Sequence, residues 1–278
     1  MPNIILAGVF IIGLCIFLYP SVSDIINSWL QGKEISKYEN FISELSNEEY
    51  DKMIADAREY NELLIDNTLI QNIEKSKNTN YKNLLSIDNT GMMGYLYINK
   101  INVRLPIYHG TDASVLQKGI GHLEGSSLPV DSETQHVVIS GHTGLPSSKL
   151  LTDLVELEVG DTFKLDILNQ KYTYEVDQIL VVEPNEIDNL ELVEGKQYAT
   201  IITCTPYGVN THRLLVRGVL KDDTVDANIS SDAIIINSNI LIQIISITLI
   251  IILFIVMIII KRKRREKEKI NEEENNIK

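Results

Sequence analysis

The sequence predicts a mainly β domain, a barrel or a sandwich, which two amphipathic helices precede and an apolar segment flanks at each end. Three observations support this fold class. Short β-rich runs separated by turn signals occupy residues 94–219, helical periodicity marks residues 34–65, and apolar runs at both ends enclose a polar, acidic middle. With 278 residues, 44% of them hydrophobic, the chain is long enough for one sizeable domain plus attachments.

The overall charge argues against one large class of function. Asp and Glu number 38 against 25 Lys and Arg, which gives a formal charge of -13. Nucleic-acid binding needs a basic face for the phosphates, so we expect no nucleic-acid partner. Two cysteines cannot build a disulfide scaffold, and 15 Gly with 7 Pro do not indicate a collagen-like or disordered chain.

The first apolar run extends from Ile4 to Tyr19 and predicts an N-terminal membrane anchor or signal within residues 1–20. Its length falls slightly short of the roughly 20 residues that a helix needs to cross a bilayer, and a cleaved signal peptide is the competing interpretation. Because no clear small-x-small cleavage site follows Tyr19, we favour an uncleaved signal anchor.

Residues 34–65 are predicted to form two amphipathic helices. Ser46, with Glu49 three residues later, forms a capping-box signature that divides the region. Apolar positions recur at helical spacing in both halves; they are Tyr38, Phe41, Ile42 and Leu45, then Tyr50, Met53, Ile54, Ala57, Tyr60 and Leu64. We interpret the helices as packed on the neighbouring domain. A partner-binding coiled coil is the alternative, but the pattern is too short for four heptads.

The periodicity fades in residues 66–90, where a polar stretch indicates a linker or surface loop. The main domain follows in residues 91–220. Its β-rich runs are Tyr95–Ile98, Val103–Ile107, His136–Ile139, Phe163–Ile167, Tyr172–Val182, Tyr198–Cys204 and Arg213–Leu220. Short helices are expected in the connections at 112–119 and 147–155, and residues 221–239 are expected to be a linker.

The second apolar run, Ile240 to Ile260, has the length and composition of a transmembrane helix. A basic cluster, Lys261 to Arg265, follows it directly. Basic residues next to a span stay on the cytoplasmic side, so residues 261–278 are predicted to be a cytoplasmic tail and the middle domain to lie outside the cell membrane.

Cys204 ends an apolar run, and two interpretations of it are open. Taken alone, such a thiol is more often a buried core residue than a nucleophile. Its context favours the nucleophile: a hairpin would return Arg213 beside Cys204, and His142 follows another predicted strand in a glycine-flanked loop. A nearby cation lowers a thiol pKa and a hydrogen-bond donor stabilises an oxyanion, so these three side chains suit acyl transfer.

The other candidate residues have weaker support. Four further histidines show no zinc-binding spacing and no dense carboxylate loop suggests calcium, so we expect no metal; these histidines are His109, His122, His136 and His212. Tyr207 borders the predicted groove, where lining the groove and packing are equal alternatives. Arg217 shares the strand and parity of Arg213, which we prefer because it lies nearer the strand start that faces Cys204.

The segment from Thr200 to Gly218, which contains Thr203-Cys204-Thr205-Pro206, is the most specific motif in the chain. It closely resembles the active-site block of class C sortases, the pilin polymerases of Gram-positive bacteria. The segment from Ser140 to Pro146 resembles the histidine motif of the same family. The likeness extends from about Gly91 to Gly218.

This resemblance implies a sortase-type eight-stranded β-barrel. It also implies a cysteine transpeptidase that cleaves an LPxTG-like sorting signal between Thr and Gly and joins the acyl group to a pilin lysine. Cys204 would be the nucleophile, His142 the general acid and later the base, and Arg213 the oxyanion stabiliser and substrate clamp.

The partners implied are LPxTG-like pilin or surface-protein substrates and the lipid membrane, with no cofactor. Two alternatives remain open. The first is a related sortase that anchors proteins to the cell wall, and the second is an inactive membrane-tethered scaffold. The second apolar run and the Cys204 block favour pilus assembly over wall anchoring, and the presence of the Cys, His and Arg together disfavours a scaffold.

The sequence departs from the family in one region. Class C sortases carry a lid before the barrel, in which the Asp of an Asp-Pro-aromatic motif pairs with the catalytic Arg and the ring covers the Cys. Here the corresponding stretch contains Asp66 but has Thr68 in place of the ring and lacks the proline. Asp66 and Thr68 are therefore the lid candidates, residues 66–90 are expected to be lid-like, and we expect the lid to be weakly held.

Overall fold

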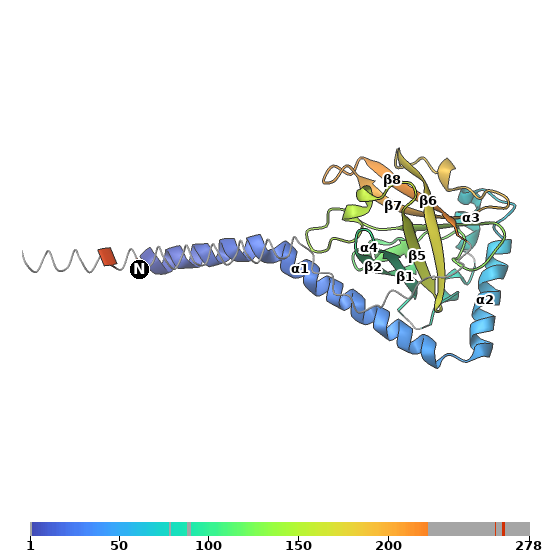
Figure 1. The fold of residues 1–278 in the computed structure, drawn as a ribbon, viewed down its shortest axis with the longest axis horizontal. Coiled ribbons are helices and arrows are strands. Elements are labelled where there is room, and N and C mark those ends of the chain that lie inside the picture. Colours follow the sequence, from blue (N-terminus) through green and yellow to red (C-terminus); the bar gives the residue numbers. More distant parts are fainter. Residues whose placement is uncertain (1, 78, 88–89, 222–258, 260–262, 265–278) are drawn as a thin grey trace, which may run out of the picture. The chain divides into compact units, whose positions relative to one another are not determined.

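The computed structural model describes residues 2–77, 79–87, 90–221, 259 and 263–264 (Figure 1). The chain divides into two compact units, Met1–Ala227 and Asn228–Lys278, and the account below concerns the first. The predicted linker 221–239, transmembrane helix 240–260 and basic tail 261–278 lie outside the described residues, apart from the few just named.

Eight strands form a closed barrel in the order β1-β2-β3-β4-β7-β8-β6-β5 (Figure 1). The pairs β2–β3 and β4–β7 are parallel, and the others are antiparallel. The strands are β1 (Met92–Ile98), β2 (Val103–His109), β3 (Ile120–His122), β4 (Gln135–Ser140), β5 (Thr162–Ile167), β6 (Gln170–Val182), β7 (Gln197–Thr205) and β8 (His212–Leu220). The predicted eight-stranded barrel is confirmed.

One strand of the barrel, β3, matches none of the β-rich runs. It has three residues, too few to show an alternating pattern, and its centre is Gly121. A Cβ atom at Gly121 would lie 2.2 Å from the carbonyl oxygen of Gly110, so only glycine fits this close approach of two backbone segments.

The helix α2 (Asn47–Glu62) begins at the predicted capping box. The Ser46 side chain accepts a hydrogen bond from the backbone N–H of Glu49, whose carboxylate accepts one from Ser46 N–H. Its apolar face packs into the main core, which confirms packing on the neighbouring domain. Asn61 is also buried there, and its side chain bonds both to Leu128 N–H and to Leu128 C=O.

The helix α1 (Pro2–Glu44) differs from the expected separate anchor and helix, because it is continuous through Pro20. Its N-terminal part extends away from the barrel (Figure 1), and the stretch is long and apolar enough to cross a membrane. Its C-terminal part is fastened to the barrel by Tyr38. The buried Tyr38 hydroxyl donates to Met93 C=O at 2.7 Å and accepts from Leu168 N–H at 2.9 Å.

The described residues between 66 and 90 contain more regular secondary structure than the predicted loop. They contain the helix α3 (Leu69–Ser76) and the 3₁₀ turn η1 (Tyr81–Asn83). A second capping box, between Thr68 and Gln71, starts α3. The polar composition conceals this helix because it buries few side chains.

The short connections agree in part with expectation. The helix α4 (Ala113–Leu116) lies inside the predicted helix 112–119. In the second predicted helix, 147–155, only the C-terminal half is helical, as part of the 3₁₀ turn η2 (Thr152–Glu156). Residues 147–151 form a loop instead, because their backbone groups bond outward to α1. A third 3₁₀ turn, η3 (Asp188–Leu190), precedes β7.

Candidate active site

The candidate residues Cys204 and Arg213 lie directly opposite each other on paired strands. Cys204 is near the end of β7, Arg213 is the second residue of β8, and the two are antiparallel partners. The hairpin between them, with its loop at residues 206–211, contains the cis Thr205–Pro206 peptide bond. The predicted return of Arg213 to the side of Cys204 is thus confirmed.

His142 follows β4, the other neighbour of β7. The two strands run parallel, and Ser140 lies opposite Ile202, so two residues further along each chain His142 reaches the level of Cys204. Two hydrogen bonds hold this level. Gly141 N–H donates to Ile202 C=O at 3.0 Å, and the Thr203 hydroxyl donates to Gly141 C=O at 2.9 Å.

The three candidates share the outer face of the sheet. Side chains alternate along a strand, and Ile201 and Val216 belong to the core inside the barrel, whereas Ile202 and Leu215 belong to a second cluster outside it. Cys204 has the parity of Ile202, and Arg213 that of Leu215.

The same reasoning places the histidine. A Cβ atom on Gly141 would meet the Leu151 side chain at 2.7 Å, so Gly141 faces the interior and His142 faces the outer side. Three adjacent chain segments, the ends of β4 and β7 and the start of β8, therefore bring the sulfur, the imidazole and the guanidinium to one face.

The side chains at this face are accessible to a ligand. The Cys204 thiol and the His142 ring are both half-buried, and neither makes a side-chain hydrogen bond within the part of the chain that the structure describes. Arg213 uses Nη1 for the carbonyl oxygens of Asn210, at 3.3 Å, and His212, at 3.0 Å. Its Nε and Nη2 donors thus make no bond among the described residues.

The second arginine of β8 has a different environment. Arg217 donates from Nε and Nη2 to both carboxylate oxygens of Asp177, at 3.1 and 2.7 Å, and its guanidinium lies 4.3 Å from the ring centroid of Tyr198. These contacts raise the Arg217 pKa, chiefly through the hydrogen bonds to Asp177. Because the Arg217 guanidinium is already paired, Arg213 is the arginine with free donors beside Cys204.

Comparison with known proteins agrees with this geometry. The sortase domain family matches residues 96–221. Sortase C1 of Streptococcus agalactiae superposes with a TM-score of 0.66 at 47% identity, covering 69% of this chain and all of that one. Sortase C of Clostridium perfringens, determined with the C-terminal cell wall sorting motif, superposes with a TM-score of 0.59 at 43% identity, covering 69% of this chain and 99% of that one.

The chain belongs to the class C sortases. The family and the enzyme class expected from the motifs, that of sortase-type cysteine transpeptidases, are thereby confirmed. Sortase D of Bacillus subtilis is 35% identical over 114 residues, which are 41% of this chain and 54% of that protein. The chain therefore spans about half the length of this more distant relative.

The lid candidates of this sortase do not meet the arginine. Asp66 is exposed in the turn after α2, and among the described residues the Arg213 guanidinium bonds to backbone carbonyls rather than to Asp66. Thr68 caps α3 and is exposed. Instead, the residue after it, Leu69, is buried, and its N–H donates to the Glu191 carboxylate at 2.9 Å.

The helix α3 nevertheless lies on the active-site side of the sortase barrel. Leu69 and Ile73 pack in the outer cluster, together with Ile202 and Leu215. Ile202 lies two positions before Cys204, and Leu215 lies two positions after Arg213, so both share the face of the candidate residues. The residues that hold this segment are therefore apolar. Sequence comparison with the lid motif misses them because it searches for an acid and an aromatic ring.

We expect Asp66→Ala to change the alkylation rate of Cys204 by less than about tenfold, because an exposed, unpaired carboxylate holds nothing in place. Leu69→Ala removes buried apolar contacts that cost about 2–5 kcal/mol when lost from a core, so a larger acceleration is expected. Stopped-flow reaction with a small thiol reagent measures both rates. An acceleration by Asp66→Ala that exceeds that of Leu69→Ala contradicts this assignment.

Three further histidines of the sortase domain are buried in hydrogen-bond networks. His122 bonds to the Tyr81 hydroxyl and to Ser127 C=O, and His136 bonds to Thr200 and to Glu191 C=O. Burial lowers the pKa of His122 and of His136 to about 4, so both rings are neutral at neutral pH. Burial likewise lowers the pKa of His109. These rings fasten loops to the barrel.

The remaining site candidate, Tyr207, is 69% exposed at the tip of the hairpin between β7 and β8. Its ring lies against the histidine loop, since a Cβ atom on Gly144 would meet the ring at 3.2 Å. Gly144 has a φ of +72°, a conformation that also favours glycine. Tyr207 thus borders the face of Cys204. That its ring lines a substrate groove stays a prediction.

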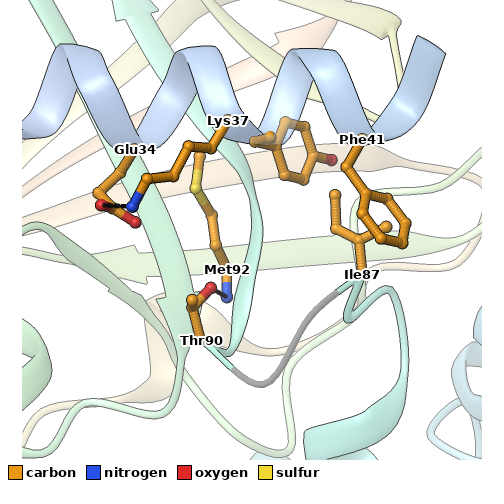
Figure 2. Close-up of a pocket in the computed structure, with 7 residues that line it drawn as sticks. Glu34, Lys37, Phe41, Ile87, Thr90 and Met92 are labelled. Atoms are coloured by element: carbon orange, nitrogen blue, oxygen red, sulfur yellow. Dashed lines mark hydrogen bonds and ion pairs between the residues drawn. The ribbon is translucent and has the colours of Figure 1, made fainter. Parts of the chain in front are cut away.

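A small pocket lies elsewhere, between α1 and the chain entering β1. It has a volume of ≈ 170 Å³ and lies beneath the ion pair of Lys37 with Glu34, at 2.6 Å (Figure 2). Tyr38 and Phe41 line it from α1, and Met92 lines it from β1. None of the candidate catalytic residues lines this pocket.

Proposed function

We propose that this sortase is a transpeptidase of pilus assembly, which cleaves an LPxTG-like sorting signal between Thr and Gly and transfers the acyl group to a lysine of a pilin. The observation that carries this proposal is the placement of Cys204 opposite Arg213, with His142 at the same level on the neighbouring strand. The C. perfringens relative, determined with a cell wall sorting motif, supports the substrate class.

In the proposed first step, the Cys204 thiolate attacks the threonine carbonyl carbon. Negative charge develops on the carbonyl oxygen, where the Nε and Nη2 donors of Arg213 stabilise it. The carbon–nitrogen bond to glycine breaks, and protonated His142 gives its proton to the leaving amine. The products are a free glycine amine and a thioester on Cys204.

In the proposed second step, a lysine amine of another pilin subunit attacks the thioester carbonyl. His142, now neutral, takes a proton from the attacking nitrogen, and the carbon–sulfur bond breaks to regenerate the thiolate. The new bond is an isopeptide bond. Atoms and charge balance without a cofactor, and no metal is part of this mechanism.

The proposal includes a location. The apolar part of α1 would anchor the chain, and the basic cluster from Lys261 to Arg265 would hold the C-terminal tail in the cytoplasm, with the barrel outside. The sortase family and the apolar helix support a membrane-associated cell-surface enzyme. Substrates would then meet the site close to the bilayer.

A competition experiment tests pilus assembly against wall anchoring. The full chain in lipid nanodiscs is given a sorting-signal peptide with equal concentrations of a pilin domain and a cell-wall cross-bridge peptide. We expect the pilin lysine to receive most of the acyl group, as measured by mass spectrometry of both products. Preferential transfer to the cross-bridge amine supports the wall-anchoring alternative, and absence of any acyl-enzyme contradicts transpeptidation itself.

A further inference from the structure

Two hydrogen bonds join the membrane-proximal part of α1 to the loop that follows His142. The Asn27 side-chain amide donates to Ser147 C=O at 2.7 Å, and Lys149 N–H donates to the Asp24 carboxylate at 2.7 Å. Both bonds bridge more than 100 residues of sequence and are part-buried. They explain why residues 147–151 form a loop rather than the predicted helix.

Further hydrogen bonds continue from these contacts to both sides of the histidine. The Thr152 hydroxyl donates to Lys149 C=O and accepts from Gly144 N–H at 3.1 Å. Leu151 N–H donates to His142 C=O at 3.2 Å. A continuous set of hydrogen bonds and peptide links thus joins the Asp24 carboxylate to His142 and to Gly144.

The loop has one internal anchor and one external anchor. Leu150 and Leu151 are buried on its inner side, and Leu150 adopts a left-handed backbone with a φ of +40°, which a non-glycine residue holds only when its surroundings impose it. On the outer side the bonds to Asp24 and Asn27 hold the segment. Without them, the backbone between Gly144 and Lys149 would be fixed from one side alone.

Asp24 also has a particular place along the chain. It is the first charged residue of the sequence and follows the apolar run that ends at Tyr19 by five residues, about 8 Å along a helix. A loop bonded to Asp24 therefore lies within about two helical turns of the apolar segment.

We propose that Asp24 and Asn27 are positioning residues, which hold the His142 loop in its working geometry and tie that geometry to the membrane anchor. The inference rests on the proposed function, in which His142 exchanges protons with the substrate. A shift of the imidazole by about 1 Å is enough to slow proton transfer strongly, because general acid–base catalysis needs hydrogen-bond distance. The bound Ser147 and Lys149 backbone groups would prevent such a shift.

The test uses the full chain in phosphatidylcholine–phosphatidylglycerol nanodiscs. Asp24→Ala and Asn27→Asp each remove one bond, whereas Asp24→Asn keeps the acceptor oxygen. Gln31→Ala is the matched control, because Gln31 makes the same kind of bond from α1 to Lys118 C=O, in a loop away from His142. The measurements are kcat and KM for acyl transfer, and the pH profile of Cys204 alkylation, which reports how His142 and the thiol interact.

We expect Asp24→Ala and Asn27→Asp to lower kcat about tenfold or more, with KM within twofold, and to shift the alkylation profile. Asp24→Asn and Gln31→Ala should match the parent. Equal kcat and equal profiles in all four variants overturn the inference, as does an equal loss in Gln31→Ala, which would indicate general support of α1. Shifted alkylation profiles in Asp24→Ala and Asn27→Asp, together with a parent chain that forms no thioester, would instead refute the proposed function and leave the positioning role standing.

Discussion

Replacing Cys204 with alanine is expected to abolish formation of the acyl-enzyme and transfer to a lysine. The thiolate is the only group in the proposed mechanism that forms a bond to the substrate carbon, and neither His142 nor Arg213 can take its place. Cys15, the one other cysteine, lies in the apolar run of α1 and cannot reach the barrel face. We therefore expect a loss to the background rate rather than a graded decrease.

Intact-mass spectrometry of the full chain, incubated with a sorting-signal peptide, measures this directly. The parent should gain the mass of the acyl fragment, and Cys204→Ala should gain nothing. Cys15→Ser is the matched control and should form the adduct at the parental rate, because it removes the other thiol. An adduct of the same mass on Cys204→Ala would show that a different nucleophile is used.

Much of the barrel could be predicted because its strands leave local signals. The runs that became β1, β2 and β4 to β8 are rich in β-branched and aromatic residues, and the Ser46 capping box marked the start of α2. The position of Arg213 beside Cys204 was also predictable, since a short hairpin between two β-runs allows few registers.

The parts that were missed depend on contacts between distant residues. The strand β3 exists because Gly121 allows its backbone to approach Gly110 closely, and no pattern in three residues reveals this. The loop at 147–151 looks helical in sequence, but Asp24 and Asn27 draw its backbone groups outward. Local propensity yields to tertiary contacts in such places.

The lid region shows the same limit in another form. The motif comparison directs attention to Asp66 and Thr68, but the structure buries their neighbour Leu69 against the outer cluster. An apolar side chain in a polar stretch is a weak signal, because its importance depends on what lies opposite. Here the same cluster contains Leu215, two positions from Arg213 on the same strand.

Arg213→Lys is expected to lower kcat for thioester formation by about 10²–10³, the usual effect of removing an oxyanion donor. Arg213 can orient itself on its own hairpin with Nη1 while Nε and Nη2 remain for the substrate. Lysine keeps the positive charge, but its three donors sit on one nitrogen and cannot serve both purposes in this fixed geometry.

Arg217→Lys is the matched control for this experiment, since it lies on the same strand and the same face. Its guanidinium is engaged by Asp177 and stacked near Tyr198, so the exchange should cost some stability but change kcat by only a few fold. Single-turnover kinetics of thioester formation separate this effect from substrate binding. If Arg217→Lys loses more activity than Arg213→Lys, the oxyanion role belongs to the paired arginine, and Asp177 must release it when substrate binds.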